Sequence, residues 1–579
     1  MKIENKEKMC VECEPTENII SENINNNKFP PEEFLPSIDK IHTVKIDMGY
    51  KYANRYIFYY AAESKKMLIR DGKFKEPIYE LEAYDDFDNS GIVKLNEKGI
   101  VEVFISEPVE YLANDGLVYD KHIHFRISND ENNNWIEDEF TIKITNDRTK
   151  HKYYDHVIIG GGIAGLYSAY KLSDKNKDDS ILILERNNYL GGRIKTIRKN
   201  IDGEEIHFDA GASRLNENHK LVKKLIGELD LTEDIYKLKK TKLIPLSRGV
   251  SYNDYLATNK KYNLKSDVNV QDLINRVIEY SNIYNKEFLT SINFIDLATL
   301  ILSTEEISYI KDIYTYDAEL YDLNAYDAKK MFKEDLNLDS NFYILKSGMS
   351  IICDKLTQIL MKRNVIIMTE TEFIEYKYNG LFNIKATHNT KKINIQSPNL
   401  VLAIPFEFLK KIKQLKSISN LINSVNQIGL NRIYAKYPEN RFDKIWFKGH
   451  DKIGTNNILK FIIPISSKTG LIMISYTDSK KAIYWNILDN YDLMEKEIHT
   501  NITELFPEKN IPPPQFINSY FWKGGIHFYK PGFNYEMIGS KIIKPFENEN
   551  LFIVGECYSD KQGWIEGSLR SVENMLKLR

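Results

Sequence analysis

Cysteine is scarce in this chain of 579 residues: it occurs four times, at Cys10, Cys13, Cys353 and Cys557. So few thiols exclude the disulfide framework of a small secreted protein and favour a reducing compartment, so we expect a cytoplasmic location. Cys10 and Cys13 form a single C-x-x-C pair with no second pair to complete a zinc site. A metal or redox role for that pair is the minor alternative.

The chain also lacks a surplus of either charge. Its 79 Lys and Arg residues face 82 Asp and Glu residues, a formal net charge of −3, which gives no electrostatic reason to expect nucleic acid or an anionic membrane as partner. No apolar run approaches the roughly 18 residues that a membrane helix needs, and the N-terminus is too charged for a signal peptide. We therefore expect a soluble protein of several domains, with no membrane span.

The most informative stretch begins at Asp155. An apolar run, Val157–Ile159, predicts a buried strand, and the glycines that follow fit G-x-G-x-x-G at Gly160, Gly162 and Gly165. In such a motif the glycines permit the tight turn, the approach of a pyrophosphate and the packing of helix on strand. A second apolar run then ends at Glu185, about 20 residues further on, where a carboxylate can accept hydrogen bonds from ribose hydroxyls. Together these features predict a dinucleotide site, with the phosphates at the helix N-terminus.

Four further motifs decide which dinucleotide. They are Leu190–Arg193 (L-G-G-R), Phe208–Arg214 (F-D-A-G-A-S-R), Leu551–Glu556 (L-F-I-V-G-E) and Gly563–Arg570 (G-W-I-E-G-S-L-R). In this order they resemble the flavin-containing amine oxidase family, monoamine and polyamine oxidases among them, and the resemblance implies FAD as the cofactor. It assigns the following residues to FAD binding: Gly160, Gly162, Ala164, Gly165, Glu185, Arg186, Gly192, Arg193, Gly211, Ala212, Ser213, Arg214, Gly555, Glu556, Trp564 and Ile565.

The predicted fold class is α/β: a Rossmann-like FAD-binding domain with an inserted α+β substrate domain, preceded by an all-β sandwich. Residues 1–38 are polar and carry Pro30 and Pro31, which predicts a disordered leader. Residues 39–148 alternate in short segments separated by turns, typical of an antiparallel β-sandwich. We expect a discontinuous FAD domain from residues 149–215, 340–410 and 540–579. The substrate domain then takes residues 216–339 and 411–539, where segments 425–438, 457–464 and 470–476 should form a mixed sheet that roofs the flavin ring.

The expected sandwich has one chemical feature of its own, His122 and His124, which point to the same face of a strand and could reach one metal ion. The segment resembles the sandwich of intradiol dioxygenases, whose iron takes two such histidines and two tyrosines. Tyr111 matches one tyrosine, but the sequence offers no convincing second. We therefore predict two structural histidines and no metal, with a metal site as the alternative.

On the substrate side, the resemblance implies a lysine on one roof strand that hydrogen-bonds through water to the flavin N5. That position falls on Arg432, with Lys436 as the counterpart in another register. Arginine stays charged and cannot act as a neutral amine, although it can bind a water or a substrate carboxylate. An arginine on the exposed face of the strand is the structural alternative.

Two aromatic side chains sandwich the substrate amine in the family. One falls on Trp564 and the other on His527, with Tyr529 as the alternative. A histidine there could titrate near pH 7 as a cage wall or acid/base, or it could be bonded to backbone in a Gly-Gly hairpin. Some family members attach the flavin through a cysteine. That position falls near Ile526 in this chain and holds no cysteine, so the FAD should be non-covalent.

We therefore expect an FAD-dependent oxidoreductase that oxidises a small molecule, an amine, by hydride transfer to flavin N5, with O2 or another acceptor reoxidising the flavin. The first alternative, favoured by Arg432 and His527, is a flavin-binding structural or interaction protein with a degenerate active site, whose sandwich mediates protein contacts or oligomerisation. The second is a related desaturase or protoporphyrinogen-type oxidase, since these share the nucleotide motifs.

Overall fold

The fold is described from a computed structural model of the chain. The structure describes residues 42–61, 69–70, 73–74, 89–106, 108, 111–112, 118–119, 122–143, 152–336, 340–363, 365–439, 445–488 and 490–579. The predicted leader, with Cys10 and Cys13, lies outside these residues. The chain divides into two compact units, Met1–Lys152 and Tyr153–Arg579.

The described part of the first unit is a β structure, with strands rich in β-branched and aromatic residues. Its longer strands are β1 (His42–Asp47), β2 (Tyr56–Ala61), β5 (Ser90–Lys94), β6 (Ile100–Ile105), β9 (His122–Ser128) and β10 (Trp135–Lys143). They form two antiparallel sheets, β1-β6 and β10-β9-β2-β5. Side chains of both sheets, among them Ile46, Tyr59, Val103 and Phe125, share one apolar core. The shorter elements are η1 (Tyr50–Tyr52), β3 (Ile69–Arg70), β4 (Lys73–Phe74), β7 (Tyr111–Leu112) and β8 (Val118–Tyr119).

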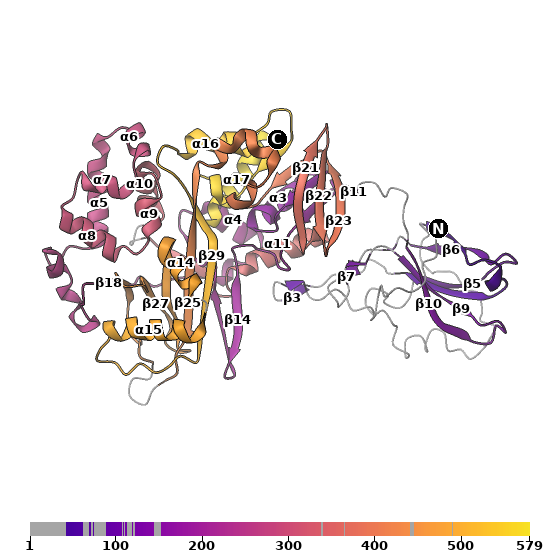
Figure 1. Ribbon diagram of the computed structural model, residues 1–579, viewed down its shortest axis with the longest axis horizontal. Coiled ribbons are helices and arrows are strands. Elements are labelled where there is room, and N and C mark those ends of the chain that lie inside the picture. The colour runs from indigo at the N-terminus through magenta and orange to yellow at the C-terminus, as the bar shows by residue number, and fades with distance from the viewer. Residues whose placement is uncertain are drawn as a thin grey trace. The chain divides into compact units, whose positions relative to one another are not determined.

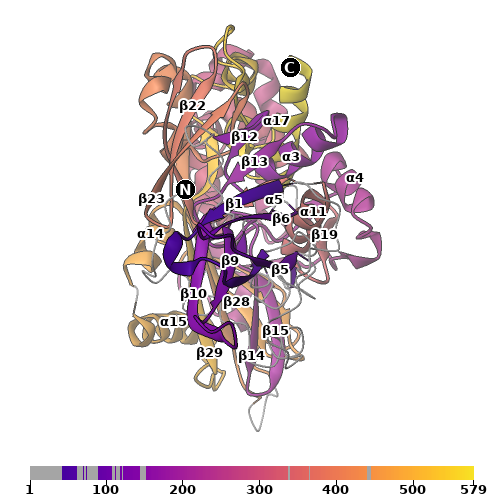
Figure 2. The same ribbon diagram turned by 90° about the vertical axis from the view of Figure 1, so that its right-hand side faces the viewer.

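A five-stranded parallel sheet forms the centre of the second unit. Its strands are β12 (His156–Ile159), β13 (Ile181–Leu184), β20 (Ile366–Met368), β24 (Leu400–Leu402) and β30 (Leu551–Ile553), in the order β20-β13-β12-β24-β30. The strands are short apolar runs because helices cover the sheet. Helix α3 (Ile163–Lys175) contacts both α11 (Ser350–Lys362) and α17 (Ile565–Leu578), and α3 and α17 lie together beside β12 and β13 in Figure 2. The end of the chain therefore returns to the glycine motif.

Smaller elements surround this core. The antiparallel hairpin β14 (Thr196–Ile201) and β15 (Glu204–Asp209) follows the L-G-G-R motif. The other small elements of this unit are β16 (Leu215–Asn216), β17 (Ile235–Lys237), β19 (Phe342–Leu345), β21 (Thr371–Tyr378), β22 (Phe382–His388), β23 (Lys391–Ser397), α4 (Lys220–Glu228), η2 (Thr232–Asp234), α12 (Phe406–Leu409), η6 (Lys413–Ile418), α13 (Ser419–Ile422), α16 (Tyr535–Ile543) and η7 (Glu556–Tyr558).

A mixed six-stranded sheet forms the second layer of this unit. Its strands are β18 (Leu243–Leu246), β26 (Lys452–Thr455), β27 (Phe461–Ser466), β28 (Leu471–Asp478), β25 (Val425–Lys436) and β29 (Phe516–Tyr529), in that spatial order. The pair β18-β26 is parallel and the others are antiparallel. Helices α14 (Ser479–Ile487) and α15 (Tyr491–Leu505) also belong to this layer. The expected segments 425–438, 457–464 and 470–476 fall on β25, β27 and β28.

A group of short helices packs beside this sheet in Figure 1 and shares an apolar core with its residues Ile428, Phe461 and Phe528. Most of these helices begin after an Asn or Ser whose side chain caps the first turn. They are α5 (Val270–Tyr280), α6 (Lys286–Ser291), α7 (Phe294–Thr299), α8 (Thr304–Ile313), α9 (Asp317–Tyr321) and α10 (Ala325–Glu334), with η3 (Tyr252–Ala257), η4 (Asn259–Tyr262) and η5 (Ser281–Ile283). Within the described residues, no helix is long and apolar enough to cross a membrane.

Candidate active site

The glycine motif joins β12 to α3 through a tight turn in which backbone packs on backbone. Gly160 has φ 106°, and a Cβ on Gly165 would lie 1.9 Å from the Gly160 carbonyl oxygen, so helix and turn touch through backbone alone. Gly162 differs, because a Cβ there would meet no atom within 4 Å. It precedes α3, whose first turn has no side-chain cap and no acidic residue. The helix N-terminus thus offers its partial positive charge toward open space.

Glu185, the predicted ribose-binding residue, lies beside the glycine motif. It is buried at the end of β13, where Oε2 accepts a hydrogen bond from the Gly161 amide at 2.8 Å. Its Oε1 accepts from the backbone and side-chain nitrogens of Asn187 at 2.9 and 2.8 Å. These bonds fix the carboxylate beside the glycine turn. Of the other predicted cofactor residues on this side, Ala164 is buried in α3 and the exposed Arg186 lies over the Phe408 ring at 4.1 Å.

A buried charged cluster links three of the predicted motifs. Glu556 Oε1 lies 2.5 Å from Arg193 Nη1 and 2.6 Å from His527 Nδ1, and its Oε2 accepts from the Gly563 amide at 3.0 Å. Burial opposes ionisation of this carboxyl, but Arg193 and His527 lower the pKa of Glu556 to about 2. Gly555, just before it, has φ 135° and open space where a Cβ would stand. Glu556 is therefore the anion that joins β29 to the C-terminal motif.

The alternative in which His527 bonds to backbone in a Gly-Gly hairpin is wrong, because Gly524 and Gly525 lie inside the continuous strand β29. The glycines are needed because β25 approaches closely at a register shift. A Cβ on Gly525 would lie 2.6 Å from the Leu430 side chain, and one on Gly524 would lie 2.8 Å from that of Gln427. Their carbonyl oxygens also accept hydrogen bonds from Arg193. His527 is fully buried and bonds to Glu556 rather than to backbone.

The six-stranded sheet holds the F-D-A-G-A-S-R segment by its carbonyl groups. Arg432 Nη1 donates to the Asp209 carbonyl at 3.0 Å and also to the Gly211 carbonyl. The Tyr434 hydroxyl donates to the Asp209 carbonyl at 2.8 Å, and Trp522 Nε1 donates to the Ala210 carbonyl at 2.8 Å. Sequence reasoning missed both aromatic residues. Tyr434 could have been predicted, because it lies two residues beyond Arg432 on the same strand and therefore points to the same face.

Arg432 lies on the inner side of the sheet, which excludes the exposed-face alternative. Its guanidinium carbon lies 4.7 Å from the centre of the Tyr476 ring. Burial opposes the charge, but the Tyr476 and Tyr434 hydroxyls raise the pKa of Arg432 above its ordinary value. Lys436 is elsewhere: its amine lies 2.9 Å from Gln515 Oε1 and 3.3 Å from Glu204, at the tip of the β14-β15 hairpin. Arg432, not Lys436, thus contacts the predicted cofactor segment.

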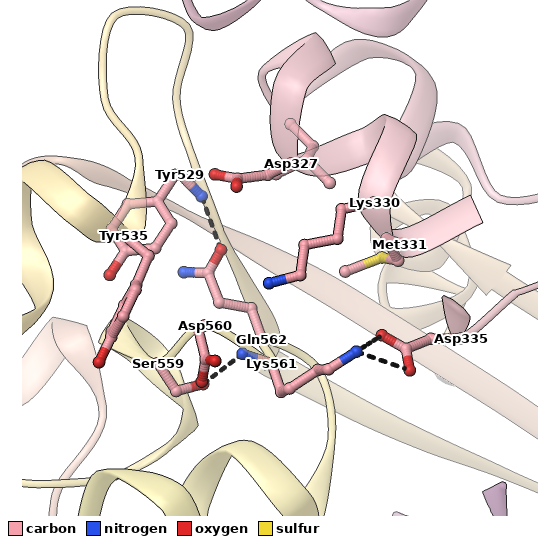
Figure 3. Close-up of a pocket in the computed structure, with 11 residues that line it drawn as sticks. Asp327, Lys330, Met331, Asp335, Tyr529, Tyr535, Ser559, Asp560, Lys561 and Gln562 are labelled. Carbon is pink, nitrogen blue, oxygen red and sulfur yellow. Dashed lines mark hydrogen bonds and ion pairs between the residues drawn. The ribbon is translucent and has the colours of Figure 1, made fainter. Parts of the chain in front are cut away.

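Trp564 and Tyr529, the other predicted cage residues, lie in different surroundings. Trp564 is half-buried directly before α17, whose first residue Ile565 is buried, and its ring meets that of His219 edge-on at 4.7 Å. Tyr529 is buried, and its hydroxyl donates to the Tyr558 carbonyl at 2.7 Å. It lines a separate polar pocket with Lys330 and Lys561, which contains neither Arg432 nor Trp564 (Figure 3). The structure thus does not bring Tyr529 and Trp564 together at one site.

Arg214, predicted as a cofactor residue, faces the helical group. Its Nη2 lies 3.3 Å from the Tyr316 hydroxyl, and its guanidinium carbon lies 4.5 Å from the centre of the Phe342 ring. It has no carboxylate within ion-pair distance among the residues that the structure describes. The neighbouring Ala212 and Ser213 are half-buried, and Gly192 packs against Gly162. The predicted flavin segment therefore ends in a cation that has no acidic partner among the described residues.

In the first unit, His122 and His124 are both buried, and their Nε2 atoms are 2.9 Å apart. The His124 ring stacks on Tyr60, and its Nδ1 lies 3.2 Å from Thr141 Oγ1. Across the described part of the chain, no three His, Cys, Asp or Glu side chains are arranged to hold a metal ion.

Comparison with known proteins completes this description. Residues 158–229 match the family model of an NAD(P)-binding Rossmann-like domain. The chain is 22% identical to a putative L-amino-acid oxidase, YobN, of Bacillus subtilis, over 76% of this chain and 97% of that protein. It is 21% identical to achacin of Lissachatina fulica over 73% of this chain and 92% of achacin, and 21% identical to the L-amino-acid oxidase of Crotalus adamanteus over 72% and 84% respectively.

The predicted resemblance to the flavin amine oxidases is confirmed. The similarity to these three proteins covers about three quarters of the chain. The fold is mixed α/β with a Rossmann-like domain, as expected.

Proposed function

We propose that this chain is an FAD-dependent oxidoreductase that oxidises the Cα–N bond of an amino acid. The observation that carries the proposal is Arg214, the last residue of the predicted flavin segment, which is hydrogen-bonded to Tyr316 and has no carboxylate partner among the described residues. A neutral amine offers such a cation nothing to bind, whereas the α-carboxylate of an amino acid does. The relatives named L-amino-acid oxidases support the same substrate class.

The residues present fit a bound FAD. At Gly162 and Gly555 the space where a Cβ would stand is open, whereas at Gly160 and Gly165 backbone atoms occupy it. Of these four positions, the motifs therefore leave room for a ligand at Gly162 and Gly555 only. The start of α3 would hold the pyrophosphate and Glu185 the ribose, and Arg193, Gly211 and Trp564 would lie toward the flavin. When bound, FAD accepts a hydride equivalent and is reoxidised by O2 or another acceptor. We propose that it is held non-covalently.

The chain's own residues bind and orient the substrate. Arg214 and Tyr316 bind its α-carboxylate, which fixes the orientation of the Cα–H bond. Arg432 holds the Asp209–Gly211 backbone in place through hydrogen bonds to its carbonyl groups. Trp564 excludes water from one side. The substrate loses two electrons and two protons, and the resulting imine is hydrolysed to a 2-oxo acid and ammonia.

A flavin-binding protein without turnover is the second candidate. Arg432 favours this candidate, because a guanidinium hydrogen-bonded to two backbone carbonyls has a structural role and cannot act as a neutral amine.

Anaerobic mixing of the FAD-loaded protein with matched pairs of substrates tests both candidates. We expect L-leucine to bleach the visible flavin absorbance and its decarboxylated analogue, isoamylamine, to fail. Arg214→Gln should raise KM on the order of 100-fold, because truncating one partner of a buried charge pair costs about 2–5 kcal/mol. Bleaching by the amine alone would contradict the carboxylate assignment. No bleaching across a wide panel of both classes would favour the protein without turnover.

A further inference from the structure

Lys452 is a second cation without an acidic partner near Arg214. It begins strand β26 and is half-buried, and its amine lies 3.8 Å from the centre of the Phe461 ring and 6.0 Å from that of Tyr316. Among the described residues, no hydrogen bond or ion pair involves this amine. Two other lysines of the same layer differ, because Lys436 is paired with Glu204 and Lys460 with Asp317.

The register of the sheet places Lys452 in line with the proposed active site. Arg432 on β25 pairs with Tyr476 on β28, Tyr476 pairs with Phe461 on β27, and Phe461 pairs with Gly454 on β26. Residues directly opposite one another share a face of the sheet, and Lys452, two residues before Gly454, shares it too. The row of paired residues therefore runs from Arg432 on β25 to Gly454 on β26, and Lys452 lies beside its β26 end on the same face.

Tyr316 connects Lys452 to Arg214. Its ring meets Phe461 at 4.8 Å and Tyr476 at 5.5 Å between centres, so it packs on the middle of the row, while its hydroxyl binds Arg214. The two cations thus lie against one tyrosine. Burial, and then the charge of Arg214, lower the pKa of Lys452 to about 7. Two like charges held together without an anion are unfavourable, and an anionic ligand between them would reverse this.

We propose that Lys452 is a specificity-determining residue that binds a side-chain carboxylate, so that the substrates are acidic amino acids. The inference rests on the proposed function: Arg214 takes the α-carboxylate and Lys452 takes the second one. Phe461 and Tyr316 hold the lysine stem and amine in place, since both rings lie within cation–π range. An uncharged amide side chain of the same shape would leave the ammonium without its counter-charge.

The test compares acid and amide pairs of equal size, L-glutamate with L-glutamine and L-aspartate with L-asparagine, on the FAD-loaded full chain. We expect kcat/KM for at least one acid to exceed that for its amide on the order of 10- to 100-fold, because only the acid gives the ammonium a charged partner. Lys452→Met should bring this ratio close to one. Lys452→Arg should keep most of the preference, and Lys448→Met, at an exposed lysine before β26, should leave it unchanged.

Equilibrium dialysis of the same ligands separates this inference from the proposed function. Turnover of neutral amino acids with no preference for either acid, or a preference that Lys452→Met leaves intact, would overturn the role of Lys452 alone. If no amino acid reduces the flavin, yet a dicarboxylate binds and Lys452→Met weakens that binding at least tenfold, the carboxylate site stands and the proposed oxidation fails. Absence of both turnover and binding of dicarboxylates would overturn the inference.

Discussion

At the scale of single residues, Glu556 is the group on which the site depends most. It is buried, and its carboxylate joins Arg193, His527 and the Gly563 amide, which come from three separate parts of the chain. Removing one member of a buried ion pair is costly because the remaining charges keep their desolvation penalty without compensation. Glu556 thus holds the strand β29 to the C-terminal motif.

We predict that Glu556→Gln destabilises the FAD-free protein by about 3–5 kcal/mol at neutral pH. The pKa of this carboxyl is lowered from 4.5 to about 2, so its contribution is complete above pH 4.5 and is lost as the pH falls toward 2. The variant should therefore lose less stability than the parent over that interval. Urea unfolding at a series of pH values measures both effects. Glu547→Gln, at an exposed position, is the control and should change stability by less than about 0.5 kcal/mol. Equal behaviour of the two variants would contradict the central role of Glu556.

At the scale of elements, the proposed nucleotide site depends on the contact of α3 with the turn after β12. Gly165 lies in α3, and the atom nearest to an added Cβ is a backbone oxygen, which cannot move aside as a flexible side chain can. Gly227 in α4 provides the opposite case, since it is exposed and an added Cβ would meet no atom within 4 Å.

We predict that these two glycines respond with opposite sign to the same substitution. Gly165→Ala should destabilise the protein by about 1–3 kcal/mol through overpacking, and it should weaken FAD binding. Gly227→Ala should stabilise it by about 0.5–1 kcal/mol, because alanine loses less conformational entropy in a helix. Thermal unfolding and FAD titration of the apoproteins measure these changes. A Gly165→Ala protein that is as stable as its parent and binds FAD equally well would show that α3 can shift away from the turn.

At the scale of the whole molecule, the two compact units have separate apolar cores. Residues such as Ile57 and Phe125 form the core of the first, whereas Val157, Leu182 and Leu569 belong to that of the second. Every residue that we place in the candidate site lies in the second unit, Tyr153–Arg579.

We therefore predict that residues 148–579 alone fold and bind FAD with an affinity within about threefold of the full chain. Size-exclusion chromatography with absorbance detection shows whether the truncated protein is folded and coloured, and titration of the apoprotein gives the affinity. Aggregation of the fragment, or loss of FAD, would show that the first unit is needed to complete the second. The full chain, stripped of FAD and reloaded in the same way, is the control for damage during preparation.

The sequence by itself determined the local elements and the order of the nucleotide motifs. The apolar run before Glu185 is the strand β13, Ile181–Leu184, and the short segments expected within residues 39–148 include the strands β1, β2, β5, β6, β9 and β10. These features were readable because turn glycines and apolar periodicity act over a few residues. The resemblance placed Arg432 at the lysine position near flavin N5, which stays a prediction, and the structure shows that its guanidinium binds the carbonyls of Asp209 and Gly211.

Only the tertiary structure decided the partners of charged and aromatic side chains. For His527 the sequence left two alternatives open, a cage wall or acid/base and a histidine bonded to backbone in a hairpin. In the structure Gly524 and Gly525 allow close strand packing, and Glu556, 29 residues away, binds the imidazole. Tyr316 and Lys452 have no local signal, since they meet only because β26, β27 and β28 bring Phe461 and Tyr476 between them. Short-range backbone preferences fix an element wherever it lies. The energy of a buried charge depends instead on which distant groups surround it, and only the assembled fold sets that.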